Sequence, residues 1–156
     1  MDSKDIILKI RKIVRSINLE SKKIEKEYGV SIPQVLCLNY LHDSLNFQAG
    51  QGEIKKFLNL NASTVSGIID RLELKGLVAR LPKSGDKRVV TIALTTKGDK
   101  LLEKLPWLLQ EKLAEKIEKL DVQKREQMKE SIEMLVNLLD IEDLEAYPPV
   151  SPNHHI

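Results

Sequence analysis

The chain has 156 residues, of which 42% are hydrophobic and 31% charged, and its formal net charge is +2. This length and apolar content suffice for one ordered domain, alone or with a dimerisation appendage. No run of 18 apolar residues occurs, the opening residues carry scattered charges, and the single cysteine, Cys37, cannot form an internal disulfide. We therefore expect a cytoplasmic protein with no transmembrane span, secretory signal, disulfide framework or cysteine-based zinc site.

The charges are unevenly distributed along the chain. Residues 51–100 carry 10 basic and 5 acidic side chains, whereas residues 101–156 carry 7 basic and 12 acidic ones. Such polarity is expected when one segment meets a polyanion and another meets solvent or protein, although chance clustering on a solvated surface gives the same counts. The two interpretations, a binding surface or chance clustering, differ in where they place the basic residues in the fold.

Two helices are predicted before residue 50. Asp2 or Ser3 can cap the first, and Gly29 can adopt the left-handed conformation that ends it. Its apolar residues recur at helical spacing: Ile6, Ile10, Ile13, Val14, Ile17 and Ile24. Ser31 and Gln34 form a capping-box pattern that starts the second helix. One side of this helix is marked by Val35, Leu38, Leu41, His42 and Leu45.

The next segment has the dimensions of a helix-turn-helix. A short helix around residues 54–58 precedes the turn 59–61, and Asn61 is a natural N-cap for the helix that follows. That helix ends at Lys75 and Gly76, and its apolar residues follow the i, i+3, i+4, i+7 pattern: Val65, Ile68, Ile69 and Leu72.

A β-hairpin is predicted directly after this unit. Apart from Arg80 and Arg88, residues 77–81 and 88–94 are β-branched or apolar, and residues 82–87 between them have turn chemistry with basic side chains. A hairpin placed directly after a recognition-type helix is the arrangement called a wing.

Helices are predicted again after the hairpin. Thr95 or Thr96 caps a segment rich in leucine that runs to Leu120, and Pro106 should kink it or start it afresh. Another helix is expected from Val122 to about Leu139. These helices carry more apolar residues than the small winged core can cover, which indicates burial against a second copy of the chain.

The expected fold is mainly α with a small β-hairpin wing. Residues 31–98 would form the winged helix-turn-helix, residues 1–30 and 99–145 the helical dimerisation region, and residues 146–156 an irregular tail. The tail contains His154 and His155, which have no cysteine or carboxylate partner nearby for a metal. No nucleophile, metalloprotease, phosphate-loop or dinucleotide motif occurs, so we expect no catalytic site, metal site or cofactor.

Residues 61–98 read NASTVSGIIDRLELKGLVARLPKSGDKRVVTIALTTKG. This segment resembles the MarR family of winged-helix regulators, whose pattern includes S-T-V-S, D-R-L-E, K-G-L-V-x-R and D-x-R-x-x-x-(V/I)-x-L-T-x-x-G. The last motif falls without gaps on Asp86, Arg88, Ile92, Leu94, Thr95 and Gly98. The resemblance implies a homodimeric repressor of a palindromic operator, with the helix order of the family over about residues 3–140.

Two groups of residues are expected to meet double-stranded DNA. When the apolar face of the recognition helix packs inward, the helical wheel places Ser63, Gly67 and Asp70 on the outward side. Thr64, Ser66 and Arg71 flank them. Hydroxyls, the helix N-terminus and an arginine can bind phosphates or base edges. The wing adds Lys83, Lys87 and Arg88. The resemblance implies that Arg88 enters the minor groove, oriented by Asp86, and a narrow A/T-rich groove would favour this.

Structural alternatives exist for these residues. Ser63, Thr64 and Ser66 are also ordinary first-turn residues, Asp70 suits pairing with a lysine of its own helix, and Lys75 and Arg80 suit plain surface charges. Gly67 departs from the basic or longer polar residue of many relatives. We interpret it as a sign of few base contacts, with groove shape and the spacing of two half-sites supplying specificity.

The resemblance also implies a small effector or a redox cysteine. Cys37 lies in an apolar stretch, which favours an inert buried thiol over an oxidant sensor. Tyr40, His42 and Trp107 are further pocket candidates, with core or interface packing as the alternative. A winged-helix protein-interaction module is the rival to the DNA-binding regulator, and the basic wing and Arg71 favour DNA.

Overall fold

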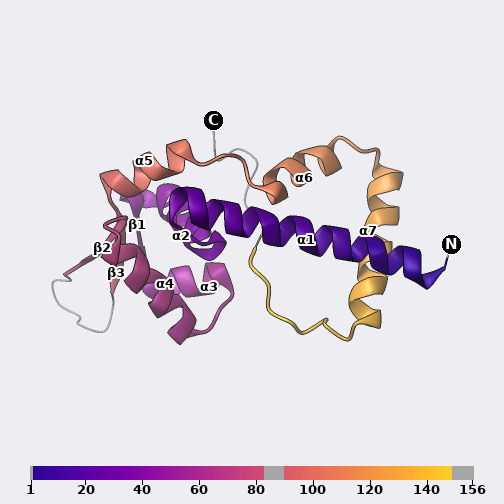
Figure 1. The fold of residues 1–156 in the computed structure, drawn as a ribbon. Coiled ribbons are helices and arrows are strands. Elements are labelled where there is room, and N and C mark those ends of the chain that lie inside the picture. The colour runs from indigo at the N-terminus through magenta and orange to yellow at the C-terminus, as the bar shows by residue number, and fades with distance from the viewer. Residues whose placement is uncertain (1, 83–89, 149–156) are drawn as a thin grey trace.

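The structure is a computed structural model that describes residues 2–82 and 90–148. Its elements are α1 (Ser3–Tyr28), α2 (Ile32–His42), η1 (Leu45–Phe47), β1 (Gln48–Gly50), α3 (Gln51–Leu58), α4 (Ala62–Leu74), β2 (Val78–Leu81), β3 (Thr91–Leu94), α5 (Thr96–Lys104), α6 (Leu109–Glu118) and α7 (Val122–Leu138). Figure 1 shows the elements from α2 to α5 gathered at one end of the long helix α1, and α6 and α7 towards its other end.

Helix α1 begins and ends as its sequence predicts. The side chain of Asp2 accepts a hydrogen bond from the backbone N–H of Asp5 at 3.2 Å, and Gly29 ends the helix with φ of 73°. Ile24 is the one residue of this helix that is buried. Ile10 and Tyr28 are half-buried, and the other apolar residues of α1 are exposed, so most of the helix gains little from packing within its own chain.

Helix α2 forms the centre of the core. Ser31 and Gln34 make the predicted capping box, and seven of the eleven residues of the helix are buried. The prediction that Leu45 continues its apolar side is wrong: α2 ends at His42, and Leu45 lies in η1 with 86% of its surface exposed. Because α2 is surrounded on all sides, a one-sided helical pattern does not describe it.

The predicted helix-turn-helix is confirmed. Helix α3 ends at Asn59, which has a positive φ of 56°, and Asn61 caps α4 by accepting the N–H of Thr64 at 2.9 Å. The inward face of α4 carries the four predicted apolar residues, all buried: Val65, Ile68, Ile69 and Leu72.

The hairpin belongs to a three-stranded antiparallel sheet in the order β1-β3-β2. Ile92 of β3 is completely buried and pairs with Ala49 of β1 and Arg80 of β2. The sequence did not predict β1, because its three residues, Gln48–Gly50, are too few to display alternation.

The leucine-rich segment after the sheet is divided rather than continuous. Thr95 caps α5 by accepting the N–H of Gly98 at 3.1 Å, and the helix ends at Lys104. Pro106 lies between α5 and α6, so the segment restarts at Leu109 as one of the two predicted outcomes. The carboxylate of Glu20 accepts the N–H of Leu109 and so connects α6 to α1.

The core of the chain is confined mainly to the winged-helix elements. In contrast, large apolar side chains are exposed along α1, α6 and α7, among them Ile6, Ile7, Ile13, Val14, Ile17, Leu113, Met128, Ile132 and Met134. Exposed apolar surface on this scale is typical of a face that another protein surface covers. Among the described residues, no helix combines the length and apolar character needed to cross a membrane.

Gly98 is the position where the packing of α5 against the sheet leaves least room. A Cβ atom built there would overlap the carbonyl oxygen of Leu77 and lie 2.7 Å from Cδ1 of Leu94. The first turn of α5 therefore packs directly on the backbone that leads into β2.

Replacing Gly98 with alanine is expected to lower the free energy of unfolding by about 1–3 kcal/mol, because backbone must move to admit the methyl group. Gly52→Ala is the matched control, since nothing lies within 4 Å of its Cβ position. That change should be neutral or stabilise by up to about 1 kcal/mol. Urea denaturation at one fixed protein concentration compares the two, and equal stability of both variants would contradict the close packing.

Candidate nucleic-acid interface

The N-terminal turn of α4 presents small polar groups to solvent. Ser63 and Thr64 are exposed, and Ser66 and Gly67 are half-buried. The hydroxyl of Ser63 donates to the side-chain oxygen of Asn61 at 2.9 Å, so Ser63 takes part in the helix cap. The exposed turn still offers the positive end of the helix dipole together with two hydroxyls, a combination suited to a phosphate.

The side chain of Arg71 lies next to Gly67. A Cβ atom at Gly67 would lie 3.5 Å from Nη1 of Arg71, so the guanidinium folds back over the glycine along the outer face of α4. Arg71 is exposed. The distance of 3.5 Å is an ordinary van der Waals contact, so the local packing does not require glycine, although a long side chain at this position would compete with Arg71 for the same surface.

Arg80 of β2 joins the hairpin to the recognition helix. Its guanidinium lies 2.6 Å from the Asp70 carboxylate and 2.8 Å from the Glu73 carboxylate, and its backbone N–H donates to Glu73 at 3.1 Å. Burial disfavours the charged form of Arg80, but the hydrogen bonds and charges of the two carboxylates outweigh it and raise its pKa. The structural alternative in which Asp70 pairs with a lysine of its own helix is therefore wrong, because its partner is Arg80 of β2. The alternative in which Arg80 is a plain surface charge is also wrong.

Lys75 has a structural role at the other end of α4. Its ammonium group donates to the backbone carbonyl of Gly29 and, at 3.0 Å, to the side-chain oxygen of Gln34. It connects the end of the recognition helix to the junction of α1 and α2. The interpretation of Lys75 as a plain surface charge is also wrong.

The wing candidates Lys83, Asp86, Lys87 and Arg88 lie outside the described residues. The strands on either side of them are described, and Leu81 pairs with Thr91 in the antiparallel register of β2 and β3. The two ends of the segment are thereby held next to each other, beside α4.

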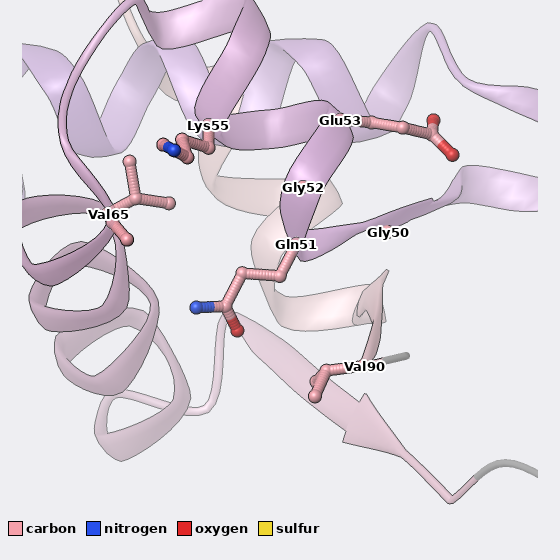
Figure 2. A pocket seen from close by; sticks show the side chains of 8 residues that line it. Gly50, Gln51, Gly52, Glu53, Lys55, Val65 and Val90 are labelled. Carbon is pink, nitrogen blue, oxygen red and sulfur yellow. The ribbon is translucent and has the colours of Figure 1, made fainter. Parts of the chain in front are cut away.

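A surface pocket of about 490 Å³ lies at the start of α3. It is lined by Gly50, Gln51, Gly52, Glu53, Lys55, Ala62, Val65 and Val90. Figure 2 shows the Gln51 side chain extending between α4 and Val90, while the Glu53 carboxylate points away from it. The residues that line this pocket do not bring an acid and a base together, as a catalytic site would. Among the described residues, no group of three histidine, cysteine or acidic side chains could hold a metal ion.

The four effector-pocket candidates are not brought together. Tyr40 stacks on Phe57 with ring centroids 4.5 Å apart, and it lines two shallow pockets that include none of Cys37, His42 and Trp107. His42 lies 3.2 Å from the Asp43 carboxylate and 3.7 Å from that of Asp99. Trp107 is half-buried in the break between α5 and α6.

Cys37 is enclosed in the core. Its surface exposure is 0%, and burial raises the pKa of its thiol to about 12. The thiolate, which is the reactive form, is therefore scarce at neutral pH. This environment agrees with the inert-thiol interpretation.

The chain is similar in sequence to known winged-helix regulators. The MarR family model matches residues 30–90, from just before α2 to just before β3. The chain is 29% identical over 114 residues to an uncharacterised HTH-type transcriptional regulator, YsmB, of Bacillus subtilis, covering 73% of this chain and 77% of that protein. It is 33% identical over 97 residues to the HTH-type transcriptional repressor MdtR of the same organism, covering 61% and 60%.

A similar solved structure is that of the Staphylococcus aureus MepR–DNA complex. It has a TM-score of 0.65 and 25% sequence identity, and the match covers 89% of this chain and 99% of that one. The similarity therefore extends beyond the winged helix into the flanking helices.

The native thiol of Cys37 is expected to resist Ellman's reagent at pH 8 and to react fully in urea. Because its pKa of about 12 exceeds the ordinary 9.0, the unfolded thiol ionises first. The stability that the folded protein gains from keeping this thiol neutral is thus complete below pH 9 and is lost as the pH rises towards 12. The inert-thiol interpretation would be contradicted if peroxide released the wild-type protein from DNA but did not release the Cys37→Ala variant.

Proposed function

We propose that this chain, whose residues 30–90 match the MarR family model, is a homodimeric transcriptional repressor that binds a pseudo-palindromic DNA operator. The observation that carries the proposal is the recognition helix α4, whose buried face is seated in the core while its capped N-terminal turn and Arg71 face solvent beside the hairpin. The relatives reported above are named as regulators, and the MepR structure is a complex with DNA.

Within this proposal, α4 lies in the major groove. Ser63, Thr64, Ser66 and the backbone at Gly67 meet phosphates and base edges at the N-terminal end, and Arg71 contacts a base edge or a phosphate. Asp70 is engaged with Arg80, so it aligns the hairpin rather than reading DNA.

The wing supplies the second part of the proposed interface. Lys83 and Lys87 neutralise phosphates, and Arg88 enters the minor groove while Asp86 orients it. The Arg80 contacts support this assignment, because they fix the base of the hairpin against the same helix that reads the major groove.

Dimerisation completes the proposed site. The apolar surfaces of α1, α6 and α7 are expected to bury against those of a second copy, which places two recognition helices about 34–36 Å apart, one turn of DNA. A small effector would then act by changing this spacing. Catalysis forms no part of the proposal.

A winged-helix module that binds protein instead of DNA is the alternative function. Such a module needs no basic wing, whereas residues 51–100 carry twice as many basic as acidic side chains. The experiment below separates the two.

Titrating the protein against a labelled library of A/T-rich imperfect palindromes at several salt concentrations is expected to select one sequence. Binding should weaken steeply with salt because phosphates are neutralised, and Arg88→Ala should weaken specific binding about 10- to 100-fold through loss of its groove contact. Arg125→Ala, an exposed arginine of α7, is the control and should bind as wild type. Weak binding without selection would favour the protein-interaction module.

Charging the apolar face of α1 is expected to dissociate the dimer. Ile13 and Ile17 are 56% and 52% exposed and lie one turn apart, so Ile13→Glu with Ile17→Glu would bury two carboxylates in the proposed interface. Arg15→Glu with Lys22→Glu adds as many glutamates to another side of α1 and should leave a dimer. Light scattering gives the mass, and a dimeric Ile13/Ile17 variant would place the interface elsewhere.

A further inference from the structure

The chain turns sharply at the end of α7 and returns to the winged helix. Asp140 adopts a positive φ of 56°, and the N–H of Ile141 donates to the carbonyl of Val136 at 3.2 Å, which ends the helix. Figure 1 shows the segment that follows running from α7 back towards the elements of the winged helix. There the side chain of Asn59 donates to the backbone carbonyl of Ala146 at 3.4 Å, across 87 positions of the sequence.

This contact lies at the turn of the helix-turn-helix. Asn59 ends α3 and precedes by two positions Asn61, which caps the proposed recognition helix α4. Pro148 is half-buried, so the end of the segment packs against other residues instead of extending into solvent. Residues 140–148, here called the return segment, therefore run from the end of α7 to the junction of α3 and α4.

The return segment is acidic, and the surface that it reaches is basic. Residues 140–148 have no basic side chain and include four acidic ones: Asp140, Glu142, Asp143 and Glu145. The last turn of α3 carries Lys55 and Lys56, whereas Glu53 lies in its first turn. The start of α4 adds the positive end of a helix dipole. Carboxylates near this surface gain the same attraction that DNA phosphates would gain there.

We propose that the return segment is an intrachain competitor for DNA. While it lies at the turn, its carboxylates lie where phosphates beside α3 and α4 would lie, so it has to leave before α4 enters the major groove. The single hydrogen bond of 3.4 Å is exposed and longer than the usual length of about 2.7–3.2 Å, which suits a contact that exchanges. Because the segment is tethered, its local concentration does not depend on the concentration of the protein.

The competition rests on the proposed function, whereas the contact does not, so the contact is tested first and without DNA. In the variant Asn59→Cys with Ala146→Cys, a short bismaleimide with a reducible arm is expected to join the two positions within one chain. Cys37 should not react, because it is buried. Asn59→Cys with Gln123→Cys, in the first turn of α7, is the control and should not be joined.

A denaturing gel with peptide mapping identifies the cross-link. Absence of a link between positions 59 and 146, a link between two chains, or equal linking of the control would overturn the intrachain contact.

The same cross-link tests the competition, because it holds the return segment at the turn. We expect the cross-linked variant to bind the selected operator about tenfold or more weakly than the same protein after its arm is reduced. Asn59→Cys alone, treated in the same way, should bind equally before and after reduction. Equal operator affinity of the cross-linked and the reduced double variant would overturn the competition.

Neutralising the carboxylates tests their contribution. Asp140→Asn, Glu142→Gln, Asp143→Asn and Glu145→Gln together are expected to tighten operator binding about three- to tenfold at low salt. The gain should shrink as added salt screens the charges. The matched control changes four exposed glutamates of α6 and α7 and alters the net charge equally: Glu118→Gln, Glu126→Gln, Glu130→Gln and Glu133→Gln. It should bind as wild type, and no gain, or equal gain in both variants, would overturn the proposal.

Failure of the proposed function would give a different pattern. If wild type selects an operator but neither the cross-link nor the neutral variant changes its affinity, the competitor alone is contradicted. If no operator is selected although the cross-link forms within one chain, the proposed function is contradicted, and the competition with it.

Discussion

The burial of α2 is the constraint from which the rest of the arrangement follows. Val35, Leu36, Cys37 and Leu38 are four consecutive residues with at most 2% exposure, so other elements must cover this helix on every side. Helices α3, α4 and α5 and strands β1 and β3 do so. Because α4 gives one whole face to this task, its other face is fixed towards solvent. The outward position of the proposed DNA contacts is therefore a consequence of core packing.

Polar contacts then hold α4 in its orientation at three points. Asn61 caps its start, Arg80 connects its middle to β2, and Lys75 connects its end to the junction of α1 and α2. Exposed ion pairs contribute little to stability, about 0–1 kcal/mol each, so their main effect here is on alignment. An interface that reads DNA with a helix and a hairpin together depends on their relative position, and Arg80 is the residue that relates them.

Local patterns predicted much of this structure. The caps at Ser31, Asn61 and Thr95 and the inward face of α4 follow from spacing within a few residues, and each is confirmed. Strand β1 was missed because its pairing with β3 joins residues more than forty positions apart. The two carboxylate partners of Arg80 are near in sequence but lie on another element, so they were missed because the contact forms only when β2 packs beside α4. The roles of the wing residues remain predictions.

Helix α1 links the proposed dimer to the proposed DNA interface. Along most of its length it exposes apolar side chains that the chain itself does not cover, yet its end is built into the winged core through Ile24 and the contact of Lys75 with Gly29. If a second copy covers the exposed length, the position of α1 is set by the dimer and transmitted to the end of α4.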